Sequence, residues 1–157
     1  MQDATYKTVV NELLVDIFND IQKIEYRSIE AYAGSQLTMC EMHIIEAIGE
    51  SPSEQMSDIA KKLRITLPTL TVSVDRLEEK GYIQRRRSAA DRRRVEVTLT
   101  EKGLQAYEYH EIFHINMINK LFEEFKIDKM PVLMESLAML RDFFRGEMDP
   151  RVDAPSA

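Results

Sequence analysis

With 157 residues, of which 44% are hydrophobic and 31% charged, the chain can form one globular core with dimerisation arms, and its composition is typical of a soluble protein. The net charge of −6 makes the surface as a whole unsuited to polyanions, and the single Cys40 excludes an internal disulfide. Because the sequence shows no bilayer-length apolar run and no signal peptide at its polar start, we expect a cytoplasmic protein without a membrane partner.

The first two predicted helices follow from apolar spacing and from capping residues. The first runs from Thr5 to Tyr32, because apolar side chains recur there at intervals of three or four residues. These side chains are Val9, Leu13, Ile17, Ile21 and Ile24. The second helix begins at Thr38, which can form a capping box with Glu41, and it ends at Gly49. Its expected buried side chains are Met42, Ile45 and Ile48.

Two shorter helices follow, and they form a candidate helix-turn-helix. The first opens at Ser53 or Gln55, and the tight turn after it falls at Arg64 and Ile65. Its inward side chains are expected to be Met56, Ile59, Ala60 and Leu63. Thr66 caps the second helix, which runs to Lys80 and stops at Gly81. Pro68 fits its first turn, where the missing N–H does no harm.

The second of these helices has one apolar face and one face suited to DNA. The expected buried side chains are Leu67, Leu70, Val74 and Leu77. Small hydroxyl side chains near its start allow close approach to base edges and phosphates. The candidate contacts are Thr66, Thr69, Thr71, Val72, Ser73 and Arg76. Asp75 shares this face, and it either accepts a hydrogen bond from a cytosine amine or orients Arg76; Glu78, Glu79 and Lys80 are expected at the helix surface.

A basic hairpin follows the helix pair. Ile83, Arg85 and Arg87 alternate with polar residues, as do Val95, Val97 and Leu99 on the return, which predicts two strands joined by residues 88–93. Six arginines lie within residues 85–94 against one acid, Asp91. A basic hairpin on an acidic body is typical of a nucleic-acid reader, and after a helix-turn-helix it predicts a winged helix. The candidate contacts of this wing are Arg87, Asp91, Arg92 and Arg93.

Two more amphipathic helices are predicted, from Leu104 to Phe125 and from Met130 to Phe144. Together with the first helix, they carry more apolar surface than a winged helix needs for its own core, which favours a homodimer. The expected fold class is therefore mostly α (α+β). We expect dimerisation helices in residues 1–36 and 104–148, a DNA-binding winged helix in residues 37–103, and a tail in residues 149–157.

The run from Leu37 to Leu121 resembles the MarR class of bacterial transcription regulators. The resemblance is carried by LEEKGYIQRRRS (residues 77–88), ADRRR (90–94) and VTLTEKG (97–103). It implies a dimeric regulator, most often a repressor, that binds a palindromic operator in double-stranded DNA. It also implies that Arg93 enters the minor groove and that the Asp91 carboxylate holds the Arg93 side chain in place. The alternative is that Asp91 is only a turn residue, a position where aspartate is common.

Three segments resemble, within this class, the repressor of fatty-acid biosynthesis genes in Gram-positive bacteria. They are EMHIIEAIG (residues 41–49), RITLPTLTVSVDRLEEKGYI (64–83) and YHEIFHINM (109–117). This finer resemblance implies control of fatty-acid synthesis genes. The effector that it implies is an acyl chain on the acyl carrier protein. More generally, we expect an apolar effector to bind in the cleft between the dimerisation helices and the winged-helix domain.

The alternative classes are a metal-responsive regulator and an enzyme. Glu41, His43, His110 and His114 are candidate metal ligands, because zinc binds imidazole and carboxylate groups one helical turn apart. No third strong ligand is fixed by spacing, so the histidines are expected to form hydrogen bonds instead, and no cofactor is expected. We find no Gly-rich phosphate loop and no spacing of a nucleophile and a base, so we expect no enzymatic activity.

Overall fold

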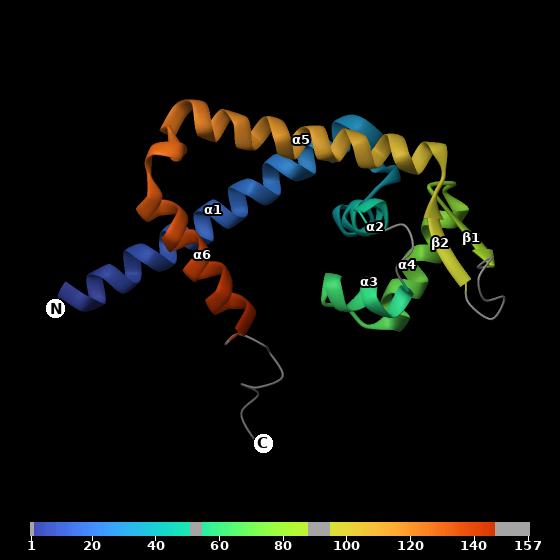
Figure 1. Ribbon diagram of the computed structural model, residues 1–157, viewed down its shortest axis with the longest axis horizontal. Helices are drawn as coiled ribbons and strands as arrows, with labels where there is room; N and C mark the ends of the chain where they lie inside the picture. The colour runs from blue at the N-terminus through green and yellow to red at the C-terminus, as the bar shows by residue number, and fades with distance from the viewer. Residues whose placement is uncertain (1, 51–54, 88–94, 147–157) are drawn as a thin grey trace, which may run out of the picture. The chain divides into compact units, whose positions relative to one another are not determined.

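The computed structural model describes residues 2–50, 55–87 and 95–146, which form six α-helices, two short 3₁₀ helices and one strand pair. Figure 1 shows their arrangement along the chain. The elements are α1 (Gln2–Ala33), α2 (Met39–Glu50), α3 (Met56–Leu63), α4 (Leu67–Glu79), β1 (Ile83–Arg87), β2 (Val95–Leu99), α5 (Glu101–Phe125) and α6 (Pro131–Gly146). Short 3₁₀ turns occupy Gly34–Gln36 and Ile127–Lys129. This is the expected mostly helical winged helix-turn-helix.

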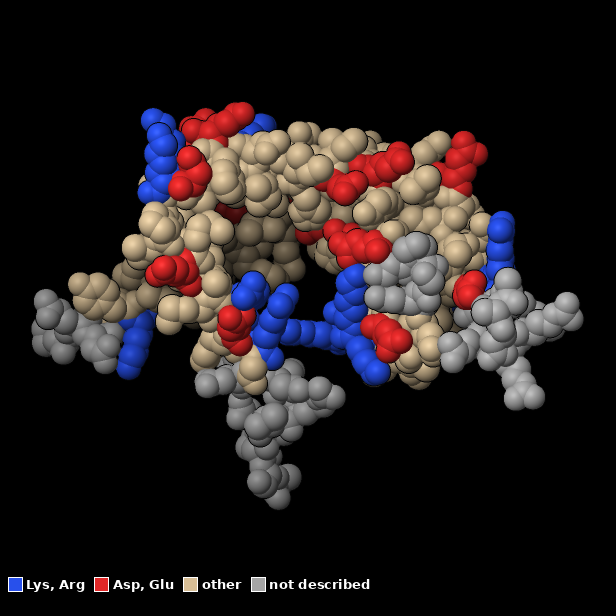
Figure 2. All heavy atoms as spheres, viewed as in Figure 1, with Lys and Arg blue, Asp and Glu red and all other residues tan. Residues whose placement is uncertain are grey.

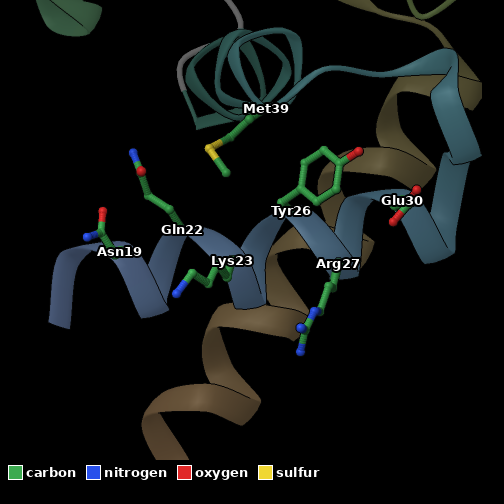
Figure 3. Close-up of a pocket in the computed structure, with 7 residues that line it drawn as sticks. All are labelled: Asn19, Gln22, Lys23, Tyr26, Arg27, Glu30 and Met39. Carbon is green, nitrogen blue, oxygen red and sulfur yellow. The ribbon is translucent and has the colours of Figure 1, made fainter. Parts of the chain in front are cut away.

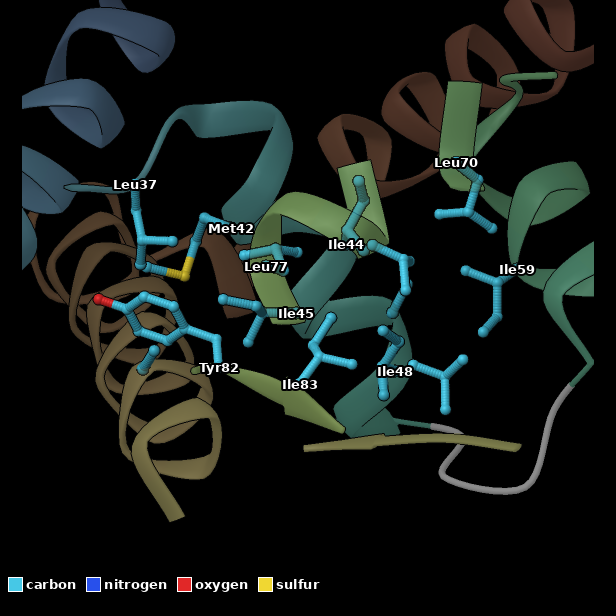
Figure 4. Close-up of a cluster of buried hydrophobic side chains, with 14 of the residues drawn as sticks. Leu37, Met42, Ile44, Ile45, Ile48, Ile59, Leu70, Leu77, Tyr82 and Ile83 are labelled. Carbon is cyan, nitrogen blue, oxygen red and sulfur yellow. The ribbon is translucent and has the colours of Figure 1, made fainter. Parts of the chain in front are cut away.

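The chain forms two compact units, residues 1–113 and residues 114–157. The core belongs to the first unit, where the apolar faces of α2, α3 and α4 meet the hairpin (Figure 4). Met42, Ile45 and Ile48 are fully buried, as predicted from their spacing. The prediction that Leu67 is buried is wrong, because this side chain is 45% exposed. Leu70, Val74 and Leu77 are buried, as predicted. Leu67 lies in the first turn of α4 and at the edge of the buried stripe, so solvent reaches it.

The predicted helix ends have their expected hydrogen bonds. The Thr38 hydroxyl accepts from the Glu41 backbone N–H at 3.2 Å, and the Glu41 carboxylate accepts from the Thr38 N–H at 2.9 Å, which completes the capping box. The Thr66 hydroxyl accepts from the Thr69 N–H at 3.3 Å at the start of α4. Gln55 precedes α3, whereas Ser53 lies outside the described residues. The turn between α3 and α4 places Arg64 in the left-handed region, with φ 55°.

The strand pair is antiparallel, with Ile83 opposite Leu99 and Arg87 opposite Val95. The passage from β2 into α5 explains the spacing of Thr100 and Gly103 in the segment VTLTEKG (97–103). The Thr100 hydroxyl accepts from the Gly103 N–H at 3.1 Å and donates to the Gly81 carbonyl at 2.7 Å, so one side chain caps α5 and ties it to the end of α4. Gly103 packs directly on the Tyr82 carbonyl, where a Cβ atom would clash.

Many apolar side chains of the long helices are exposed in the single chain. Val9, Leu13, Ile17, Ile21 and Ile24, which define the apolar stripe of α1, are each between 42% and 56% exposed. Within Pro131–Gly146 no side chain is buried, although α6 is strongly amphipathic. Among the described residues, no helix is both long and apolar enough to span a membrane.

Candidate nucleic-acid interface

The outward face of α4 is exposed and rich in hydroxyl groups. Thr66, Thr69 and Thr71 are all exposed, and Ser73 is half-buried. The Thr66 and Thr69 hydroxyl oxygens lie 2.8 Å apart, and the Thr71 hydroxyl donates to the Leu67 carbonyl at 2.9 Å. Each hydroxyl keeps acceptor capacity beyond these local bonds. The start of α4 therefore presents polar groups without large side chains in front of them.

Val72 and Arg76 continue this face toward the end of the helix. Val72 is 50% exposed, and Arg76 is exposed one turn further on. An exposed apolar group and an exposed guanidinium on one helix face match the thymine methyl and guanine acceptors of the major groove. Apart from the half-buried Ser73, the side chains that the spacing predicted to point away from the core are thus exposed in the structure.

Asp75 has a partner that the sequence did not predict. Its carboxylate forms an ion pair with the Arg85 guanidinium of β1. Glu78 holds the same arginine: its Oε2 lies 2.6 Å from Arg85 Nη1, and its Oε1 accepts from the Arg85 N–H at 3.0 Å. Two carboxylates of α4 therefore fix the base of the hairpin, and we call this set of three residues the wing clamp.

A second ionic contact joins the end of α4 to the start of α2. Lys80 Nζ lies 2.7 and 2.8 Å from the two carboxylate oxygens of Glu41. Burial by itself raises the pKa of the Glu41 carboxyl, but the hydrogen bonds from Lys80 and from the Thr38 backbone together hold that pKa below its ordinary value. Glu78 and Lys80 are therefore partly exposed at the helix surface, as expected, and they also form ion pairs within the domain.

The wing contacts lie mostly outside the described residues. Arg87 ends β1, whereas Asp91, Arg92 and Arg93 fall within residues 88–94, which the structure does not describe. On the face shown in Figure 2, basic and acidic side chains of the described residues are interspersed. The six arginines of residues 85–94 are therefore concentrated in the sequence, whereas the described residues on that face carry charges of both signs.

An open pocket of about 500 Å³ lies along α1 (Figure 3). Its lining is polar except for the Tyr26 ring and the Met39 side chain of α2, and it includes the cations Lys23 and Arg27. The remaining lining residues are Asn19, Gln22 and Glu30.

The histidines belong to a cluster that differs from the predicted one. His43 Nε2 lies 2.6 Å from Glu25 Oε1, and His110 Nε2 lies 3.4 Å from the same oxygen. Glu41 is not part of this cluster, because its carboxylate binds Lys80 and Thr38. His114 belongs to the second unit. Glu25, buried within α1, is the member that sequence spacing missed.

The chain is similar to known transcription regulators. The MarR family model matches residues 37–95. FabT of Streptococcus pneumoniae, solved in complex with DNA, is 35% identical, with a TM-score of 0.83 over 88% of this chain and 97% of that chain. The transcriptional repressor YetL of Bacillus subtilis is 24% identical over 85% of this chain and 79% of its own. A variant of S. aureus MepR bound to an oligodeoxyribonucleotide shares the fold, with 24% identity and a TM-score of 0.61 over 83% of this chain and 97% of that chain.

Proposed function

The chain belongs to the MarR family of DNA-binding transcription regulators, and from this premise we propose that it is a dimeric repressor that reads an operator with helix α4. The observation that carries the proposal is the exposed outward face of α4. Thr69, Val72 and Arg76 lie on that face, while the wing clamp joins the helix to β1 and the Glu41–Lys80 pair joins its end to α2. A rigidly held helix with an exposed polar face is suited to base readout.

Each protomer has two kinds of contact in this proposal. Helix α4 lies in the major groove, with Thr66, Thr69, Thr71, Val72, Ser73 and Arg76 facing bases and phosphates. The wing lies along the backbone, with Arg87 and Arg92 near phosphates and Arg93 in the minor groove. Asp91 braces Arg93 there, because a neighbouring carboxylate restricts the rotamers of a long side chain before binding.

The dimer is proposed because of the exposed apolar side chains of the terminal helices. The stripe of α1 and the amphipathic α6 expose large apolar groups that a single chain leaves in water. We propose that residues 1–36 and 104–148 cover these groups in a second copy, with residues 37–103 as the DNA-binding part. A twofold dimer binds two half-sites about one helical turn apart, so the operator is an imperfect palindrome. Light scattering at micromolar protein should return a dimer mass, and a monomer mass would refute this assembly.

The finer proposal is that the regulated genes are those of fatty-acid synthesis and that the effector is an acyl chain on its carrier protein. It rests on the resemblance of residues 41–49, 64–83 and 109–117 to the fatty-acid repressor and on the similarity to FabT. We propose no enzymatic activity, since the relatives are transcription regulators. A DNA partner places the protein in the cytoplasm.

The direct test uses a palindromic site selected from a random DNA library. Arg76→Ala and Thr69→Ala should each weaken binding to that site by about 1–3 kcal/mol if the side chain contacts a base. Thr69→Ser keeps the hydroxyl and is the matched control, which should retain most of the affinity. Non-specific DNA should bind all variants with similar affinity. Specific binding equal to that of the unaltered protein in both alanine variants would show that α4 does not read the bases.

A further inference from the structure

Arg64 is an exposed cation in the turn between α3 and α4, shortly before the proposed reading helix begins. Its two neighbours, Leu63 and Ile65, are half-buried and pack against the hydrophobic core. The turn is held by hydrogen bonds from the Arg64 N–H to the Lys61 carbonyl at 3.1 Å and from the Ile65 N–H to the Ala60 carbonyl at 3.0 Å. Because the turn is fixed and both neighbours face the core, the Arg64 side chain stands outward in water.

Arg64 differs from the two lysines that precede it, because each lysine has an acidic partner. Lys61 Nζ lies 3.3 Å from Asp58 Oδ1, and Lys62 Nζ lies 2.6 Å from Glu50 Oε2. In the part of the chain that the structure describes, the Arg64 guanidinium forms no ion pair and no hydrogen bond. Its charge and its five N–H donors therefore remain available to an anion from outside the chain.

The position of Arg64 brings this charge close to the proposed reading face. Thr66 follows it by two residues, and Thr69 is exposed one helical turn further on. Successive Cα atoms are about 3.8 Å apart, so the Cα atoms of Arg64 and Thr66 are separated by at most about 7.6 Å. An extended arginine side chain spans most of that distance. If Thr66 and Thr69 lie at the edge of the major groove, Arg64 reaches the phosphates that border it.

We propose that Arg64 binds a DNA phosphate beside the bases that α4 reads, a proposal that rests on the proposed function of α4. The planar guanidinium can donate two hydrogen bonds to the phosphodiester oxygens. This contact is separate from those of the wing, because Arg64 precedes α4 in the sequence and the hairpin follows it. Each protomer then holds the DNA backbone with two different segments. Since a phosphate carries no sequence information, Arg64 contributes to affinity and to the register of α4, and not to the choice of bases.

The test measures the binding of Arg64→Asn to two DNA duplexes, the selected palindromic site and an unrelated sequence. Asparagine removes the charge and tolerates the left-handed backbone of this position, φ 55°, so circular dichroism should show an intact fold. One phosphate contact contributes about 0.9 to the slope of log affinity against log salt. Arg64→Asn should therefore reduce that slope by about one per protomer. It should weaken binding to both duplexes by about fivefold per protomer at about 0.15 M salt.

Two further variants separate a phosphate contact from a general effect of charge. Arg64→Lys keeps the charge and should retain most of the affinity and of the salt slope. Lys126→Asn is the matched control, because it removes a cation from another exposed residue with a left-handed backbone, φ 49°, between α5 and α6. It should bind both duplexes as the unaltered protein does.

The proposal is overturned if Arg64→Asn binds both duplexes with the affinity and the salt slope of Lys126→Asn. Weaker binding to the selected site alone would also overturn it, because that pattern indicates a base contact. Either result leaves the reading of DNA by α4 in place when Arg76→Ala still weakens binding to the selected site. The failure of this proposal is thereby distinguished from a failure of the proposed function.

Discussion

Glu78→Gln isolates the ionic part of the wing clamp. The carboxylate lies 2.6 Å from the Arg85 guanidinium and also accepts the Arg85 N–H at 3.0 Å, and the amide keeps an acceptor for the second bond. Removing a charge-assisted hydrogen bond costs about 1.5–3 kcal/mol, and an exposed ion pair contributes about 0–1 kcal/mol. The Glu78 and Arg85 side chains are 38% and 27% exposed, so the contribution of this pair should lie between the value for a charge-assisted hydrogen bond and the value for an exposed ion pair. We therefore expect a loss of about 1–1.5 kcal/mol of unfolding free energy.

Thermal unfolding followed by circular dichroism measures this loss. For a chain of this size, the expected change lowers the midpoint by about 3–6 °C. Glu79→Gln is the matched control, because it makes the same change at the next, exposed position and should stay within about 0.5 kcal/mol of the unaltered protein. Both variants remove one negative charge near the DNA, so a difference between their operator affinities reports the position of the wing. Equal thermal midpoints for the two variants would refute the clamp.

Three further predictions concern the Glu41 pair, the start of α5 and the wing. Because the folded state lowers the pKa of Glu41 from 4.5, its ion pair stabilises the fold above that pH and loses this effect as the pH falls through the folded value. The difference in urea unfolding free energy between the unaltered protein and Glu41→Gln should therefore shrink from pH 7 to about pH 3, and a constant difference would contradict this. Gly103→Ala should destabilise by about 1–3 kcal/mol in urea, because its Cβ meets the Tyr82 carbonyl, and an unchanged midpoint would show that the contact relaxes. Arg93→Ala should lower DNA affinity and reduce the salt slope by about one per protomer. Asp91→Ala should also weaken binding at matched salt, whereas tighter binding would leave only a turn role for Asp91.

Most of the local structure could be predicted because its causes lie within a few residues of one another. Thr38 and Glu41 are three positions apart, and so are Thr66 and the N–H that it caps. Strand alternation and helical apolar spacing have the same local character. Leu67 shows the limit of this reasoning, because the same spacing that identifies the core face says little about how far solvent reaches into the first turn.

The pairs that join different elements could not be predicted in this way. Asp75 meets Arg85 only because β1 returns along α4, and no residue spacing encodes that return. The histidine cluster is a stronger case, since Glu25 and His110 lie on helices far apart in the sequence. The sequence pointed to Glu41 because it stands two positions from His43, but the capping box and Lys80 already hold that carboxylate.

Genome-wide mapping of the DNA bound by the protein tests the central claim most directly. If the chain is a dimeric repressor that reads DNA with α4, the bound fragments should be promoter segments that share an imperfect palindrome with half-site centres about one helical turn apart. Fatty-acid synthesis promoters among them would support the finer proposal. Bound DNA without any shared sequence, or no enrichment over input DNA, would contradict the account.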